Sequence, residues 1–431
     1  MWSCPNCGSW IFASRICPNC GAWVGDDSAD EQDSDHPVEL AIMGDTLLSC
    51  SGREAKVVVP AGVKELEEYS FYNDTALQEI ELPEDLTMIL KCAFQECTAL
   101  QEIRLPDKLK RLGRAAFYGC SALRKIEIPA SVKQIDTETF RDCTALRVIE
   151  LSEGLEIIGG YVFKGCNALE KIVIPASVKQ IELEAFQDCT ALQEIRLPDG
   201  LELIGRSAFS ECEALQEIRL PDGLKEIGSD AFSGCRSLRQ ITVPVGVKCI
   251  ETAVFRSCRA LQEVHLPEGL EQIGMFAFED CDTLTRIVLP ASLKRLCRGA
   301  FENCTSLLEA QLPDGLEELQ DDAFEYCRSL QKVTIPAQVR QIERAAFYYC
   351  QSLQEVQLPE ELNEIGEDAF AHCWALKRIV IPAGVEKVGE HAFWECYSLQ
   401  NIAVLSDDTE IAEDAFEDCP GTVKRGTGSS F

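Results

Sequence analysis

Residues 220–242 read LPDGLKEIGSDAFSGCRSLRQIT, and this 23-residue unit recurs along most of the 431-residue chain. Pro60 opens a series of prolines at the same interval that runs to Pro382, with Ser152 in the one gap. A fixed period in the twenties is typical of a solenoid, whose units bury their apolar sides only by stacking on each other. Phenylalanine marks sixteen consecutive units without an insertion or deletion: Phe71, Phe94, Phe117, Phe140, Phe163, Phe186, Phe209, Phe232, Phe255, Phe278, Phe301, Phe324, Phe347, Phe370, Phe393 and Phe416.

Each unit carries its own local structural signals. The alternation that ends in Ile195 and Leu197 predicts a short strand, and Pro198 ends it because proline lacks a backbone donor. Ala208, Phe209 and Cys212 follow a spacing of about three, which predicts one helical turn. The expected fold class is therefore an α/β-type repeat solenoid, with one short parallel strand and one helical turn per unit.

The 23 cysteines divide by position into a periodic and an irregular group. Fifteen of them recur every 23 residues from Cys97 to Cys419, one per unit. Disulfide frameworks belong to short secreted chains with irregular spacing, whereas buried free cysteine behaves as a small apolar residue. The periodic cysteines are therefore predicted to be reduced core residues, and the alternative is a disulfide scaffold.

Two copies of the sequence Cys-Pro-Asn-Cys-Gly stand near the N-terminus. Cys4, Cys7, Cys17 and Cys20 provide two pairs of thiolates, each pair with two residues between its members. Four thiolates complete a tetrahedral shell that suits one structural Zn²⁺ per chain and leaves no open position for catalysis; iron is the alternative metal. The repeated pair resembles the small zinc ribbons found at the N-termini of many bacterial proteins. The ribbon either binds a partner or has a structural role only, in which the metal stabilises the fold of the ribbon itself.

The charge balance excludes several classes of function. The chain has 72 Asp and Glu against 40 Lys and Arg, a net charge of −32, so we expect no nucleic-acid binding. No apolar run reaches the roughly 18 residues of a membrane span, so no membrane insertion is expected.

The sequence does not begin with a basic stretch leading into an apolar run, which favours a cytoplasmic protein over a cell-surface or secreted one. No catalytic pattern surrounds the four histidines, which predicts that the protein is not an enzyme.

The repeat resembles the BspA-like leucine-rich repeat family, whose units share the Ile-Gly-x-x-Ala-Phe-x-x-Cys-x-x-Leu core and the Leu-Pro ending. The resemblance covers about residues 38–419 and implies a role in protein binding or adhesion. It also implies that residues 38–60 form an N-terminal capping hairpin. The expected domains are a zinc ribbon at 1–24, an acidic linker at 25–37, the hairpin, a solenoid at 61–419 and a flexible tail at 420–431.

Two surfaces are candidates for binding a partner protein. One is the open strand face, where Glu102 faces Lys125 on the next unit. The other is an aromatic cluster near the C-terminal end. If its segments are helical turns, residues two after Phe face solvent and those four after Phe are partly buried. Core packing is the alternative reading of these residues, which are Tyr326, Tyr348, Tyr349, His372, Trp374, Trp394 and Tyr397.

Acidic residues near the cluster, such as Glu325, Glu367 and Asp368, favour a basic partner. The sequence thus predicts a non-enzymatic protein–protein interaction scaffold. The alternative is a bacterial surface adhesin of the BspA-like type that is exported by an unrecognised route.

Overall fold

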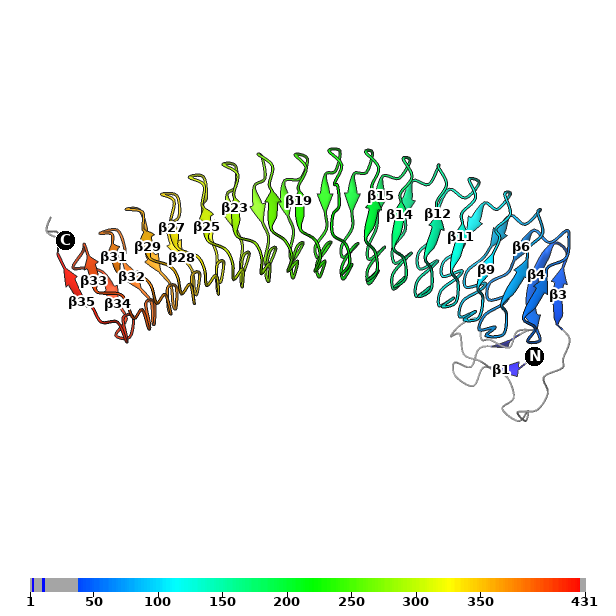
Figure 1. The fold of residues 1–431 in the computed structure, drawn as a ribbon, viewed down its shortest axis with the longest axis horizontal. Coiled ribbons are helices and arrows are strands. Elements are labelled where there is room, and N and C mark those ends of the chain that lie inside the picture. The colour runs from blue at the N-terminus through cyan, green and yellow to red at the C-terminus, as the bar shows by residue number, and fades with distance from the viewer. Residues whose placement is uncertain (1, 4–9, 12–37, 427–431) are drawn as a thin grey trace.

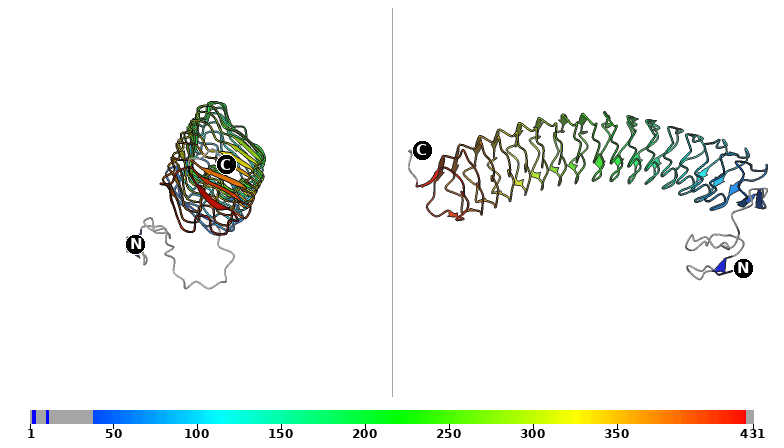
Figure 2. Two further views of the ribbon diagram at one scale, coloured as in Figure 1. Left: turned by 90° about the vertical axis from the view of Figure 1, so that its left-hand side faces the viewer. Right: turned by 60° about the horizontal axis from the view of Figure 1, so that its bottom comes forward.

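The computed structural model of the chain describes residues 2–3, 10–11 and 38–426. Residues 38–426 form one row of stacked coils, which curves gently from the blue N-terminal end to the red C-terminal end in Figure 1. Seen end on, the coils overlap in a single closed outline, as the left panel of Figure 2 shows. Each coil is one 23-residue unit, so the predicted repeat solenoid is confirmed. Ahead of it in the sequence, β1 (Trp2–Ser3) and β2 (Trp10–Ile11) form an antiparallel pair.

The first column of strands lies where the alternating Ile-x-Leu pattern predicts it. The column comprises five sheets, in which each strand pairs in parallel with at least one neighbour, usually at an offset of one unit, as Ile172 does with Ile195. The central residue points inward and its neighbours point to solvent. The strands are β5 (Lys56–Val58), β7 (Glu79–Glu81), β9 (Glu102–Ile103), β11 (Lys125–Glu127), β12 (Val148–Glu150), β14 (Lys171–Val173), β16 (Glu194–Arg196), β19 (Gln240–Thr242), β21 (Glu263–His265), β23 (Arg286–Val288), β25 (Glu309–Gln311), β27 (Lys332–Thr334), β29 (Glu355–Gln357), β31 (Arg378–Ile381), β33 (Asn401–Val404) and β35 (Thr422–Arg425).

A second column of strands was not predicted from the sequence. In most units it lies at the residue pair that ends five residues before the repeated Phe, and Ile181 pairs there with Ile204. Most of its strands are only two residues long: β4 (Thr46–Ser51), β6 (Glu65–Leu66), β8 (Met88–Ile89), β10 (Arg111–Leu112), β13 (Ile157–Ile158), β15 (Gln180–Ile181), β17 (Leu203–Ile204), β18 (Glu226–Ile227), β20 (Cys249–Ile250), β22 (Gln272–Ile273), β24 (Arg295–Leu296), β26 (Glu318–Leu319), β28 (Gln341–Ile342), β30 (Glu364–Ile365), β32 (Lys387–Val388) and β34 (Glu410–Ile411).

The predicted helical turn is wrong, because the segment around each Phe is a chain of tight turns. We call the eight residues from three before Phe to four after it the Phe turn. In the Phe209 turn, Ser207 and Glu211 have φ of 51° and 57°, in the left-handed region that interrupts a helix. The N–H groups of Ser207, Phe209 and Glu211 donate to carbonyls of the next coil at 2.9, 2.8 and 2.7 Å. These amides connect neighbouring coils instead of closing a helical turn, and residues 38–426 contain no α-helix.

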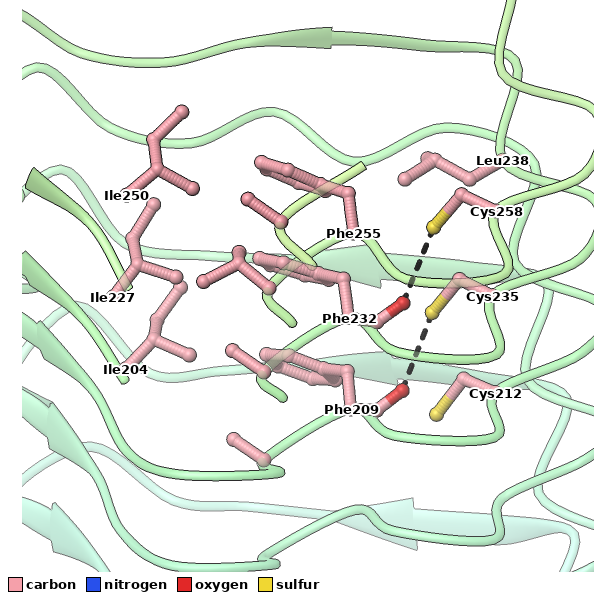
Figure 3. Packing of buried hydrophobic residues seen from close by; sticks show 14 of the residues in the cluster. Ile204, Phe209, Cys212, Ile227, Phe232, Cys235, Leu238, Ile250, Phe255 and Cys258 are labelled. Carbon is pink, nitrogen blue, oxygen red and sulfur yellow. Dashed lines mark hydrogen bonds between the residues drawn. The ribbon is translucent and has the colours of Figure 1, made fainter. Parts of the chain in front are cut away.

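The core consists of side-chain ladders that run the length of the solenoid. The sixteen repeated Phe rings stack on each other with centroids 5.0 Å apart at both ends and at most 5.8 Å between. Beside them, each ladder cysteine donates its Sγ–H to the Phe carbonyl of the preceding coil. Figure 3 shows this for Cys235 and Cys258, whose sulfurs lie 3.2 and 3.3 Å from the carbonyl oxygens of Phe209 and Phe232.

All nineteen cysteines within residues 38–426 are free, and fourteen of the fifteen in the ladder are fully buried. Burial raises the pKa of the Cys212 thiol well above its usual value, so the group stays protonated as a donor. The prediction that these cysteines are reduced core residues is therefore confirmed.

The two ends of the solenoid differ. At the N-terminal end, β3 (Glu39–Met43) and β4 form an antiparallel hairpin, and β4 continues into the second strand column through β6. At the C-terminal end, β35 pairs in parallel with β33 over four residues. The prediction of a flexible tail from residue 420 is therefore wrong for residues 422–425, which extend the first sheet.

Candidate functional site

The open face of the first strand column carries ladders of opposite charge. Lys125 and Glu102 are register partners, as predicted, but the Lys125 ammonium lies 2.7 Å from Glu127 and 3.5 Å from Glu150. On the next coils Lys171 and Glu194 lie 3.0 Å apart. All these side chains are close to half exposed or more, so water screens each pair and the pairs add little to the stability of the sheet. The face largely satisfies its own charges, and its strands carry no Phe, Tyr or Trp side chain.

The seven residues of the predicted aromatic cluster meet in one network that spans the Phe turns of four successive coils. Tyr349 lies at its centre, with its ring centroid 5.3 Å from that of Tyr326, 4.2 Å from that of His372 and 6.0 Å from that of Trp374. Trp374 continues to Tyr397 at 6.3 Å. The network closes through pairs of Tyr348 with Tyr349 and His372, and of His372 with Trp394. The periodicity therefore identified a real spatial cluster.

The exposure of the cluster is the reverse of the prediction. His372, expected to face solvent, is only 4% exposed, and Tyr326 and Tyr349 are half-buried. Trp374 and Tyr397, expected to be partly buried, are 38% and 53% exposed. The helical angle between positions fails because Tyr326, Tyr349 and His372 have left-handed φ of 57–60°. Within residues 38–426, Trp374 and Tyr397 are the only two exposed aromatic residues.

A half-buried acid, Glu395, lies beside His372 and Tyr397. Glu395 Oε2 lies 2.9 Å from His372 Nδ1, and both side chains are mostly buried. The nearby Glu395 carboxylate raises the pKa of the Tyr397 hydroxyl to about 12. Glu395 thus lies between the buried His372 and the exposed Tyr397.

Carboxylates crowd the Phe turns on the N-terminal side of the cluster. Burial, together with the nearby charges of Asp322 and Glu302, raises the pKa of Glu325 to about 7. The pKa of Glu302 is also raised to about 7, by burial and by the nearby charges of Glu279 and two aspartates. Asp322 itself is buried and held by two guanidinium groups, at 2.9 Å from Arg298 and 3.3 Å from Arg344. Crowding and burial thus make Glu325 and Glu302 bind a proton more readily than free glutamates do.

A shallow cavity of about 380 Å³ lies where the Phe370 and Phe393 turns begin. Its charged lining consists of Glu367, Glu390, Glu410 and Lys387, and Lys387 lies 3.2 Å from Glu364. The only positive charge of the lining is thus already paired, while its three carboxylates surround the opening.

Four tyrosines in the N-terminal half occupy Phe turns as well, and the sequence interpretation missed their common location. Arg141 lies over the rings of Tyr118 and Tyr161 at 5.5 and 5.9 Å, and Lys91 lies over Tyr69 at 5.6 Å. Tyr72 packs edge-on against Tyr69. Every tyrosine of the chain lies within four residues of a repeated Phe, so tabulating tyrosine by repeat position would have identified this face.

The predicted metal ligands Cys4, Cys7, Cys17 and Cys20 lie outside the described residues. The part of the chain that the structure describes holds no group of three or more His, Cys, Asp or Glu arranged to bind a metal. Those same residues include no helix that is long and apolar enough to cross a membrane.

Comparisons with known proteins agree with this architecture. Residues 64–193, 179–308 and 298–423 match the family model described as a BspA type leucine rich repeat region. A solved leucine-rich repeat protein from Bacteroides ovatus is 32% identical with a TM-score of 0.69, covering 75% of this chain and 86% of that one. A leucine rich cell surface protein from Faecalibacterium prausnitzii is 29% identical with a TM-score of 0.52, covering 77% and 96%. No curated protein matches the chain.

Proposed function

This chain belongs to the BspA-type leucine-rich repeat family, and we propose that it is a non-enzymatic scaffold that binds a protein partner through the Phe turns of its C-terminal coils. The observation that carries the proposal is the exposed pair Trp374 and Tyr397. Large aromatic side chains supply much contact area at little cost in side-chain entropy and dominate binding hot spots. The strand face offers no such anchor and pairs most of its own charges.

A photo-crosslinking experiment tests this assignment. A benzophenone amino acid is placed at Tyr397 and, as a matched control, at Val173, which is 62% exposed on the strand face. We expect a discrete partner adduct from position 397 that is lost when Trp374→Ala is added, and none from position 173. Adducts from both positions alike, or none from position 397, would refute the Phe-turn site.

We propose display at the cell surface in place of the cytoplasmic location expected from the sequence. The Faecalibacterium prausnitzii relative is described as a cell surface protein, which supports this location. The cysteine content does not oppose it, because ladder thiols such as Cys212 are fully buried and kept away from oxidants. Protease treatment of intact host cells tests the location: a surface protein is digested, whereas a cytoplasmic one survives until the cells are lysed.

We also propose that Cys4, Cys7, Cys17 and Cys20 hold one structural Zn²⁺. The support is the repeated Cys-Pro-Asn-Cys-Gly sequence, together with the antiparallel pair β1 and β2 on either side of the first copy in the sequence. Two pairs of thiolates meet the tetrahedral preference of zinc. Metal analysis of the purified chain tests this proposal, and a preparation with iron in place of zinc would identify the alternative metal.

A further inference from the structure

Charge is distributed unevenly along the Phe turns. The first nine turns, from Phe71 to Phe255, contain ten Asp and Glu and eight Lys and Arg, whereas the last seven contain fifteen and three. The last three turns have no Lys or Arg at all. Their eight acidic residues are Glu367, Asp368, Glu390, Glu395, Glu413, Asp414, Glu417 and Asp418. His391 lies 3.4 Å from Asp414 and 3.9 Å from Glu417, and His372 lies beside Glu395, but the other five carboxylates have no cationic partner in these turns. A surface with this excess of negative charge is electrostatically complementary to a cationic ligand.

The exposed aromatic pair lies within these same three turns. Trp374 ends the Phe370 turn and Tyr397 ends the Phe393 turn, with their ring centroids 6.3 Å apart and their planes 32° from parallel. The face of an indole or phenol ring attracts a cation, and a nearby carboxylate adds an ion-pair partner. Glu395, two residues before Tyr397 in the same Phe turn, provides that carboxylate.

The carboxylate-lined cavity lies at the opposite end of the same turns. Glu367 and Glu390, which begin the Phe370 and Phe393 turns, line it together with Glu410. An extended polypeptide that crosses a Phe turn would therefore meet carboxylates at one end and the two rings at the other. Cationic side chains a few residues apart along such a segment would reach both ends.

We propose that the Phe turns of Phe370, Phe393 and Phe416 bind an extended, arginine-rich segment of the partner protein, with one guanidinium over the rings of Trp374 and Tyr397. The proposal rests on the protein-binding function proposed above and names the chemistry of the bound segment. Arginine fits better than lysine because its planar guanidinium stacks on aromatic faces and sheds water more easily.

Fluorescence anisotropy with the full chain tests this proposal. The probe is a short fluorescein-labelled peptide of alternating Arg and Ser, and matched peptides carry Lys or Glu in place of Arg. We expect the Arg peptide to bind tightest and the Glu peptide not to bind. The Trp374→Ala, Tyr397→Ala double variant should weaken binding of the Arg peptide about tenfold or more, whereas Trp374→Phe should retain part of it. Val173→Ala, on the strand face, is the control variant and should bind normally.

The acidic residues are tested separately from the rings. Glu367→Gln with Glu390→Gln should weaken binding and reduce its dependence on salt, because fewer charges then attract the peptide. Unchanged Arg-peptide affinity in the double aromatic variant, or equal affinity for the Arg and Glu peptides, would overturn the proposal. If such a result occurs while crosslinking at position 397 still captures a partner, the binding function stands and only the arginine-rich ligand is wrong. If both experiments fail, the Phe-turn site itself is wrong.

Discussion

Replacing one ring of the phenylalanine ladder tests the stacked core directly. Phe209 is fully buried, and its ring lies 5.3 Å from that of Phe186 and 5.4 Å from that of Phe232. Truncating a buried Phe to Ala costs about 3–5 kcal/mol, and losing both stacked neighbours places Phe209→Ala in the upper part of that range. The terminal ring Phe416 is only partly buried and has one neighbour, at 5.0 Å, so Phe416→Ala should cost about half as much.

The loss should appear locally, because each coil of a solenoid contacts only its neighbours. In Phe209→Ala the amides that join the mutated coil to the adjacent coils should lose protection from hydrogen exchange. These amides belong to Glu184, Phe186 and Asp188, which donate into the Phe209 turn, and to Ser207 and Glu211, which donate out of it. A local cost of about 4 kcal/mol corresponds to roughly a thousandfold faster exchange.

Hydrogen-exchange mass spectrometry of the folded chain measures this pattern. Phe209→Leu serves as the control, since it keeps most of the buried volume and should cost only about 1 kcal/mol. Unchanged exchange in residues 184–211 would refute the stacked-core reasoning. Equal acceleration over all coils would instead refute the nearest-neighbour picture, because it would mean that the solenoid opens as one unit.

The other predictions concern the thiols, the buried acids and the metal. In the native protein a thiol reagent should leave the buried ladder cysteines from Cys97 to Cys396 unmodified and should modify them after denaturation, since they are fully buried. Because the pKa of Glu325 is raised from 4.5 to about 7, the folded state binds a proton that the unfolded state releases, and stability should fall as pH rises through this interval. At pH values above 7, Glu325→Gln should therefore have a higher melting temperature than the unaltered chain, and below pH 4.5 it should not. Glu317→Gln, at an exposed position, should leave the melting temperature unchanged in both pH ranges. The chain should contain one Zn²⁺ that Cys4→Ser with Cys20→Ser removes, and deleting residues 1–36 should leave the melting temperature of the solenoid unchanged.

The repeat and one strand column could be predicted because sixteen units without an insertion place equivalent residues in register. Ile172 and Ile195 occupy the same position of consecutive units, so stacking the units pairs them. The second strand column was missed because elements as short as Glu226–Ile227 show too little alternation to reveal a strand. Only the pairing with the neighbouring coil defines them.

The helical turn was predicted wrongly because a spacing of three between apolar residues fits both a helix and a pair of tight turns. Residues with left-handed φ distinguish the two structures. In most units these residues are not glycine but residues with a side chain, such as Ser207 and Glu211. The sequence did contain one clue. Gly119, Gly165 and Gly234 occupy the position two after Phe in three units, with φ of 70–73°. Glycine at that position indicates a left-handed conformation, which the other units adopt with larger residues.

The same error made the predicted exposure of the aromatic cluster wrong. The repeat predicts exposure better, through the residues that other units carry at the same position. The position four after Phe holds Thr98, Ser121, Thr144 and Asn167 in earlier units, and a column of small polar residues marks a surface that faces water. Trp374 and Tyr397 depart from this column, where the fold requires no large apolar side chain. The fourteen other residues of the column include no aromatic one, so packing does not explain these two rings. Their location among turns that hold eight carboxylates and no Lys or Arg supports contact with a cationic partner as the explanation.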